Sequence, residues 1–125
     1  AAFLSRRYGF AVAAEELLVS NGNSHAIEFC VRHLVEPGDA IVMDDPTYFL
    51  VGEILRRSRA RIRLVRTHPS RGFDVDALER ALRRSAAAGV QRPISLVYLA
   101  SPTHHNPTGA SLSRGAARRL AALAR

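Results

Sequence analysis

The sequence predicts an α/β fold, a partial and mostly parallel sheet flanked by helices. Apolar runs at 40–43 and 94–100 are typical of strands that are buried in parallel sheets. Segments in which apolar residues recur at helical spacing lie between and after these runs. Alternation of strand with helix is the pattern of a parallel sheet whose faces are covered by helices.

The composition is that of a globular domain rather than of a disordered chain. Of the 125 residues, 47% are hydrophobic and 23% are charged, which allows a sizeable core within at most one domain. No apolar run approaches the roughly 20 residues that span a bilayer, so we expect no membrane segment. The lone Cys30 cannot form an internal disulfide and fits a reducing compartment, and we expect the cytoplasm.

The net charge of +7 raises the question of a nucleic-acid partner. All 18 basic residues are arginines, scattered along the chain with one denser run at 56–66. No zinc-finger, winged-helix or RNA-recognition pattern accompanies them. We therefore expect the arginines to cover solvated faces rather than to form a nucleic-acid site.

In the first half of the chain, helices and strands are expected over these segments: a helix end at 1–7, a short strand at 15–19, a helix at 26–35, a buried strand at 40–43 and a helix at 49–57. Cys30 falls on the apolar face of its helix and is expected in the core. Asp44 and Asp45 follow the strand and are expected to be solvated.

The second half continues the alternation. Basic and apolar residues alternate over 61–65, which predicts a strand near the sheet edge or half covered. Asp74 is expected to cap the next helix. Arg92-Pro93 then leads into the strand at 94–100, expected to be buried on both faces, and a last helix begins near 113.

Three loops follow the carboxyl ends of three of the strand candidates, those at 15–19, 40–43 and 94–100; the loops are 22–24, 45–48 and 103–109. The carboxyl ends of parallel strands share one rim, and ligands of open α/β sheets bind there. The first loop combines backbone N–H groups, a hydroxyl and a helix N-terminus, which suits a phosphate. Tyr48 could cover a flat ligand, and Asn106 offers an amide before a candidate cis proline bond. Together these groups suggest a planar, phosphorylated cofactor.

Four motifs occur in a fixed order, Asn-Gly-Asn-Ser-His-Ala at 21–26, Glu-Pro-Gly-Asp at 36–39, Pro-Thr-Tyr at 46–48 and Asn-Pro-Thr-Gly at 106–109. This set resembles the class I/II aminotransferases of fold type I, which use pyridoxal phosphate (PLP), and is closest in style to 2-aminoadipate transaminases and MocR-type regulators. The resemblance implies that Asn23 and Ser24 hold the PLP phosphate, that Tyr48 stacks on the ring, and that Asn106 bonds the phenolic oxygen of the ring.

The resemblance also implies groups that this sequence does not contain. The family needs a lysine bound covalently to the cofactor, and the sequence has none. We therefore expect residues 1–125 to be a fragment of the PLP-binding large domain, without a catalytic residue and inactive alone. The N-terminal segment, the rest of the large domain and the small domain would lie outside it. A homodimer and amino acid and 2-oxo acid substrates are further implications.

Other interpretations remain open. The parent protein could be a MocR-type transcription regulator, with a DNA-binding winged helix before Ala1, or a truncated remnant without catalysis. Asn23 and Ser24 could cap a helix, Tyr48 could be a rim aromatic, and Asn106 could belong to a plain turn. Adjacent His104 and His105 lack further ligands, so no metal site is expected, and no role is assigned to His105.

Overall fold

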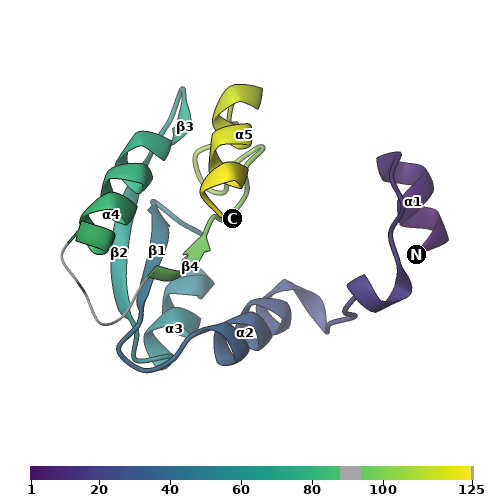
Figure 1. Ribbon diagram of the computed structural model, residues 1–125, viewed down its shortest axis with the longest axis horizontal. Helices are drawn as coiled ribbons and strands as arrows, with labels where there is room; N and C mark the ends of the chain where they lie inside the picture. The colour runs from purple at the N-terminus through teal and green to yellow at the C-terminus, as the bar shows by residue number, and fades with distance from the viewer. Residues whose placement is uncertain (88–93, 125) are drawn as a thin grey trace.

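The computed structural model describes residues 1–87 and 94–124, which form a four-stranded sheet with helices on both faces (Figure 1). The elements are, in order, α1 (Ala2–Tyr8), η1 (Ala14–Glu16), α2 (Gly22–Leu34), β1 (Ala40–Asp45), α3 (Phe49–Arg57), β2 (Arg61–His68), β3 (Gly72–Phe73), α4 (Val75–Ala87), β4 (Ile94–Tyr98) and α5 (Arg114–Leu123).

The sheet has the strand order β3-β2-β1-β4, and its three longer strands are parallel. Only the two-residue β3 runs antiparallel, beside the end of β2. The predicted α/β class with a mostly parallel sheet is confirmed. The strand that was predicted near an edge, β2, pairs along its length with β1 and on its other side only through Thr67 and His68.

Two separate clusters of apolar side chains hold the helices to the two faces of the sheet. Neighbouring residues of a strand point to opposite faces, and in β1 Ile41 packs with Val31 of α2 and Leu55 of α3. Val42 instead joins the cluster of Leu78 from α4, against which residues of α5 pack. Both β1 residues are fully buried. Thus α2 and α3 cover one face, and α4 and α5 cover the other.

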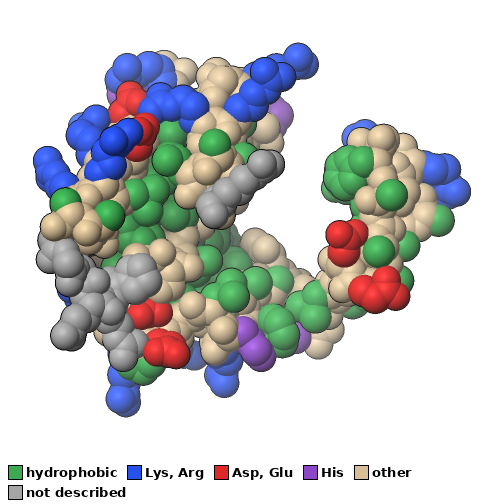
Figure 2. Space-filling model, viewed as in Figure 1, with side chains coloured by type: hydrophobic (Ala, Val, Ile, Leu, Met, Phe, Trp, Pro, Cys, Tyr) green, Lys and Arg blue, Asp and Glu red, His purple; other side chains and the backbone are tan. Residues whose placement is uncertain are grey.

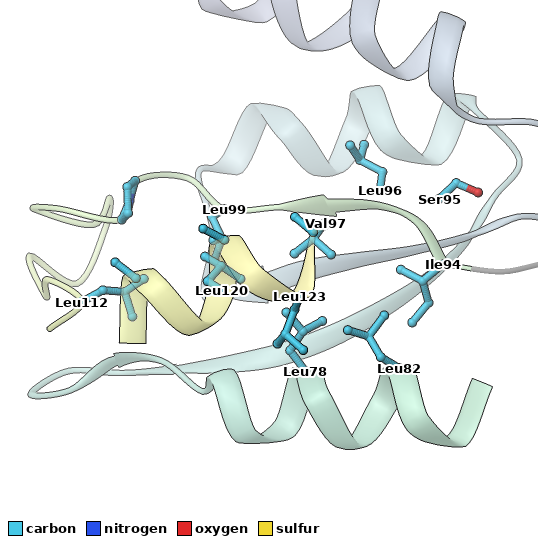
Figure 3. A pocket seen from close by; sticks show the side chains of 14 residues that line it. Leu78, Leu82, Ile94, Ser95, Leu96, Val97, Leu99, Leu112, Leu120 and Leu123 are labelled. Carbon is cyan, nitrogen blue, oxygen red and sulfur yellow. The ribbon is translucent and has the colours of Figure 1, made fainter. Parts of the chain in front are cut away.

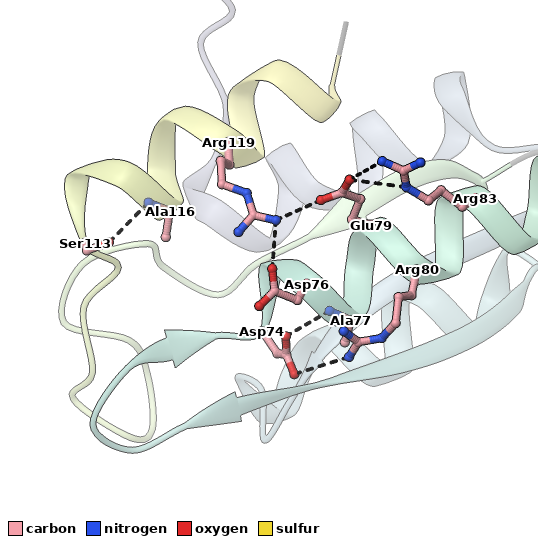
Figure 4. A network of polar contacts seen from close by, with 9 residues as sticks. All are labelled: Asp74, Asp76, Ala77, Glu79, Arg80, Arg83, Ser113, Ala116 and Arg119. Atoms are coloured by element: carbon pink, nitrogen blue, oxygen red, sulfur yellow. Dashed lines mark hydrogen bonds and ion pairs between the residues drawn. The ribbon is translucent and has the colours of Figure 1, made fainter.

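Polar contacts fix the starts of α4 and α5 and tie the two helices together (Figure 4). Asp74 and Ser113 each accept a hydrogen bond from the backbone N–H three residues later, at 2.8 and 3.2 Å. The predicted cap at Asp74 is therefore confirmed. Arg119 of α5 reaches Asp76 at 2.7 Å and Glu79 at 2.8 Å on α4.

The prediction that the strand at 94–100 is buried on both faces is wrong. β4 lies at the edge of the sheet, and its residues are only half-buried. An apolar cleft of about 600 Å³ separates it from the facing sides of α4 and α5 (Figure 3). Its wall includes Leu78, Leu82, Val97, Leu120 and Leu123. The Arg92-Pro93 approach to this strand lies outside the described residues.

The N-terminal segment extends away from the body as an arm that carries α1 and η1 (Figure 1). The predicted strand at 15–19 is wrong, because the structure has η1 there and then extended chain. Strand hydrogen bonds need a neighbouring strand, and no described strand pairs with 17–19. Leu18 and Val19 are consequently exposed at 61% and 95%.

Cys30 is exposed, which contradicts its predicted place in the core. On α2 the residues that pack toward the sheet are Ile27 and Val31, four positions apart. Cys30 precedes Val31 by one position, and one position turns a helix by about 100°, so its side chain leaves the covered face.

Arginine side chains are spread around the rim of the body in the face that Figure 2 shows, while apolar side chains line its hollow centre. Several of them pair with acidic residues on their own helix, as Arg32 does with Glu28 at 2.7 Å. Within the described residues, no helix combines the length and the apolar character that crossing a membrane requires.

Candidate functional site

The carboxyl ends of β1 and β4 lie side by side at the rim of the sheet. The two strands are parallel neighbours, with Met43 opposite Tyr98. The chain leaves β1 toward α3 and leaves β4 toward α5, and these helices lie on opposite faces. Such a point, where connections diverge from adjacent parallel strands, is where open α/β sheets bind ligands. The loops 46–48 and 99–112 border it.

A buried pair of side chains joins the end of β1 to the loop after β4. Asp44, in β1, is fully buried, and the side chain of His105 is 3% exposed. His105 Nε2 lies 2.8 Å from Asp44 Oδ2, although the residues are 61 positions apart. The same carboxylate oxygen accepts the backbone N–H of Ala100 at 2.8 Å. The prediction that Asp44 is solvated is therefore wrong, because the loop after β4 folds over it; Asp45 is exposed as predicted.

The second ring nitrogen of His105 is also engaged, by the hydroxyl of Thr108 at 2.8 Å. An ionised carboxylate only accepts hydrogen bonds, so Nε2 carries the proton that Asp44 accepts. In the neutral ring Nδ1 is then the acceptor of the Thr108 hydroxyl. The Thr108 oxygen in turn accepts the N–H of Ala110 at 3.3 Å. The chain of bonds runs from strand β1 through the imidazole into the loop.

Asn106 follows His105 directly and presents its side chain to solvent. Its amide makes no hydrogen bond within the described part of the chain, so donor and acceptor are both available to a ligand. The Asn106–Pro107 bond is cis, as predicted, and so is Asp45–Pro46 in the neighbouring loop. The main chain beneath Asn106 is held by bonds from His105 N–H to Ala110 O at 2.8 Å and from Gly109 N–H to His105 O at 2.6 Å.

Tyr48 is half-buried at the start of α3, where its ring meets Phe49 edge-on at 5.1 Å between centroids. It packs on the same cluster as Ile27 from the early turns of α2. Tyr98, at the end of β4, lies close enough for electrostatic coupling to Tyr48 and Asp44. Burial first, and then the negative charge of Asp44, raise the pKa of the Tyr98 phenol above its ordinary value of 10.0.

Asn23 and Ser24 lie in the exposed first turn of α2. A strand was predicted before this loop, but the structure has extended chain of the N-terminal arm there instead. No side chain caps this helix: Asn21 makes no capping bond, and its backbone N–H donates to His25 Nδ1 at 3.1 Å. The first N–H groups of a helix have no partner within the helix and favour an anion. The uncapped start contrasts with the capped starts of α4 and α5.

The chemistry of three groups suits a planar, phosphorylated cofactor. The open start of α2 has N–H donors of the kind that a phosphate needs, Tyr48 has an aromatic face, and Asn106 has an amide without a partner in the described structure. Ile27 and Tyr48 share one apolar cluster, so the start of α2 and the Tyr48 loop lie on the same face of the sheet.

Comparison with known proteins identifies the family. The sequence profile described as "Aminotransferase class I and II" matches residues 1–125. The chain belongs to this family. The predicted family is thereby confirmed. Among the similar solved structures, the α-aminoadipate aminotransferase LysN of Thermus thermophilus, described as complexed with N-(5'-phosphopyridoxyl)-L-leucine, superposes with a TM-score of 0.78 at 25% identity, covering 98% of this chain and 28% of that protein. Its ligand agrees with the predicted cofactor at the level of the family.

Individual relatives show how much of a protein the chain spans. Arginine–pyruvate transaminase AruH of Pseudomonas aeruginosa is 35% identical over 118 residues, covering 94% of this chain and 28% of that protein. The HTH-type transcriptional regulator YdcR of Escherichia coli is 27% identical, covering 96% and 25%. A Thermus thermophilus aspartate aminotransferase mutant superposes with a TM-score of 0.77 at 31% identity, covering 98% and 30%. The chain spans less than a third of each of these relatives.

The sequence prediction missed Asp44, His105 and Thr108. A carboxylate placed directly after an apolar strand run was one available signal, because burial of a charge requires a partner. His105 adjoins the predicted Asn106, yet nothing in the sequence indicates which side chain of a loop turns inward.

Proposed function

We propose that this aminotransferase-family chain forms the part of the large domain that holds PLP. One observation carries the proposal: the loops of Tyr48 and Asn106 follow adjacent parallel strands, and the buried Asp44–His105 bond joins the end of β1 to the loop of Asn106. The amide of Asn106 has no partner in the described structure, which supports a role in binding a ligand.

In this proposal each predicted residue has one task. The N–H groups at the start of α2, with the side chains of Asn23 and Ser24, bind the phosphate. Tyr48 lies against the face of the pyridine ring. Asn106 donates to the phenolic oxygen and stabilises its ionised form. When bound, PLP supplies the electron sink that permits loss of the proton at the substrate α-carbon.

The activity of the whole protein is proposed as transfer of an amino group between an amino acid and a 2-oxo acid. None of residues 1–125 is a lysine, so these residues bind and orient the cofactor and do not hold it covalently. A homodimer and a cytoplasmic location remain predictions from the family resemblance and from the single cysteine.

A second candidate is the effector domain of a transcription regulator. The matches to YdcR and to the HTH-type transcriptional regulator YjiR of Escherichia coli favour it. The coding sequence on both sides of the segment separates the candidates. A winged helix before Ala1 would support the regulator, whereas a lysine-bearing continuation without a winged helix would support the enzyme.

The binding proposal is tested by titrating the chain with PLP and following the visible absorbance of the cofactor. We expect reversible binding that Asn106→Ala weakens about tenfold, the effect of losing a well-placed hydrogen bond. Borohydride treatment should leave no adduct at an interior residue. Because the chain is strongly basic, Arg118→Gln on the outer side of α5 serves as the charge control and should change nothing. Equal weakening by both substitutions would contradict the proposal.

A further inference from the structure

We propose that His105 is a positioning residue that, through Asp44 and Thr108, fixes Asn106 for the cofactor. This inference rests on the proposed function and assigns a task to residues that do not themselves contact the ligand. The His105 side chain is 3% exposed and that of Asp44 is fully buried, so neither side chain can contact a cofactor bound at the rim of the sheet. Their effect must pass through the exposed neighbour, Asn106.

The imidazole of His105 is held at both nitrogens. Nε2 donates to Asp44 at 2.8 Å, and Nδ1 accepts from Thr108 at 2.8 Å. The carboxylate belongs to β1 and the hydroxyl belongs to the same loop as His105. A ring bonded on both sides cannot turn without breaking a buried hydrogen bond, and that is costly. The His105 side chain therefore holds the loop in a fixed position relative to the end of β1.

The main chain of His105 is held as firmly as its ring. Its N–H donates to Ala110 and its carbonyl accepts from Gly109. Farther out, Leu112 N–H donates to Pro102 O at 2.8 Å and closes the base of the loop. Asn106 stands at the tip with no side-chain bond of its own within the described structure. The position of its backbone, from which the amide projects, is consequently set by the residue before it.

Asp44 connects the end of β1 with the chain that follows β4. Its Oδ2 accepts from Ala100, just after β4, and from His105 in the following loop. Four residues after Asp44, the same chain reaches Tyr48. The other carboxylate oxygen of Asp44, Oδ1, is buried without a partner in the described part of the chain. If His105 were removed, the N–H of Ala100 would be the one donor left to this carboxylate within the described residues.

The test compares His105→Ala with His105→Gln, whose amide can donate to Asp44 and accept from Thr108. The first readout needs no ligand: ¹⁵N relaxation of the Asn106 backbone amide. We expect this amide to be ordered in the parent chain, mobile in His105→Ala and ordered again in His105→Gln. A long-range ¹H–¹⁵N spectrum should show the Nε2–H form of His105. Unchanged order in His105→Ala, or the Nδ1–H form, would overturn the inference.

The second readout compares the affinities for PLP and for inorganic phosphate. His105→Ala should weaken PLP binding about tenfold, leave phosphate binding at the start of α2 unchanged, and add nothing in an Asn106→Ala background. A merely structural role would weaken both ligands and would multiply with Asn106→Ala, which would overturn the inference. If His105→Ala does not fold, Thr108→Val removes only the hydroxyl and should show the same pattern in smaller measure.

The two readouts separate failure of this inference from failure of the proposed function. Absence of PLP binding by the parent chain would refute the cofactor proposal, while the order of Asn106 would still decide whether His105 positions it. Normal PLP binding that is insensitive to His105→Ala would refute only the positioning role.

Discussion

Replacement of Asp44 by alanine should destabilise the fold strongly, because the carboxylate is the shared acceptor of two buried donors. Asp44→Ala leaves the Ala100 N–H and the His105 Nε2–H without partners. An unsatisfied buried donor costs about 1–3 kcal/mol, and the substitution leaves two such donors. The substitution also removes the cost of burying the unpartnered Oδ1. We expect a loss of about 3 kcal/mol from the free energy of unfolding.

Urea denaturation followed by far-ultraviolet circular dichroism measures this loss. With a slope of about 1.5 kcal/mol per M, the midpoint should fall by about 2 M without a change of slope. Asp45→Ala, at the exposed neighbouring position, is the matched control and should stay within about 0.5 kcal/mol. Asp44→Asn keeps one acceptor oxygen and should lie between the two. If Asp44→Ala were as stable as the Asp45 control, the cost of burying the carboxylate would equal the value of its bonds and the reasoning would fail.

Three further outcomes test the packing, a helix cap and the electrostatics. Leu55→Ala, at a fully buried position, should lose about 2–5 kcal/mol in the same urea assay, whereas Leu64→Ala, at a position 59% exposed, should stay within about 0.5 kcal/mol. Ser113→Ala should lose about 1 kcal/mol, and Ser113→Asp, which can still accept the capping bond, should lose little. The raised pKa of Tyr98 means that folding favours its neutral form, so this contribution is complete below the unfolded value near 10.0 and disappears as the pH rises through the folded value. Tyr98→Phe should therefore remove a step at high pH from the phenolate titration at 295 nm and lessen the alkaline loss of stability.

Most of the fold between residues 40 and 124 could be predicted because its signals are local. The alternation of apolar runs with helical periodicity determines which segments become strands and which become helices. The helix predicted over 49–57 coincides with α3, and the cap at Asp74 is where the sequence places it. The two-residue β3 was missed, since so short a strand exists only by virtue of its pairing with β2.

The failures arise where structure depends on distant partners. The segment 15–19 has the composition of a strand, but a strand is completed by a neighbour, and the described sheet offers none there. The strand at 94–100 has the apolar composition of a central strand and yet lies at the edge, beside the cleft to α4 and α5. Composition indicates how apolar a strand is; burial depends on what packs against it.

Asp44 shows most clearly what limits prediction of the site. A carboxylate at the end of an apolar strand can be solvated, if the sheet ends before it, or buried, if a donor lies above it. The sequence favoured the first alternative. The second becomes apparent only when β1 and β4 are known to be neighbours, with Met43 opposite Tyr98, because this pairing brings the loop of His105 over the end of β1. Asp44 and His105 could therefore be found only together, and only after the strand order was known. Tyr48 and Asn106 each stand in a short pattern of their own, and their binding roles stay predictions from the ordered set of motifs, whereas the bond between the end of β1 and the loop of Asn106 belongs to none of these patterns.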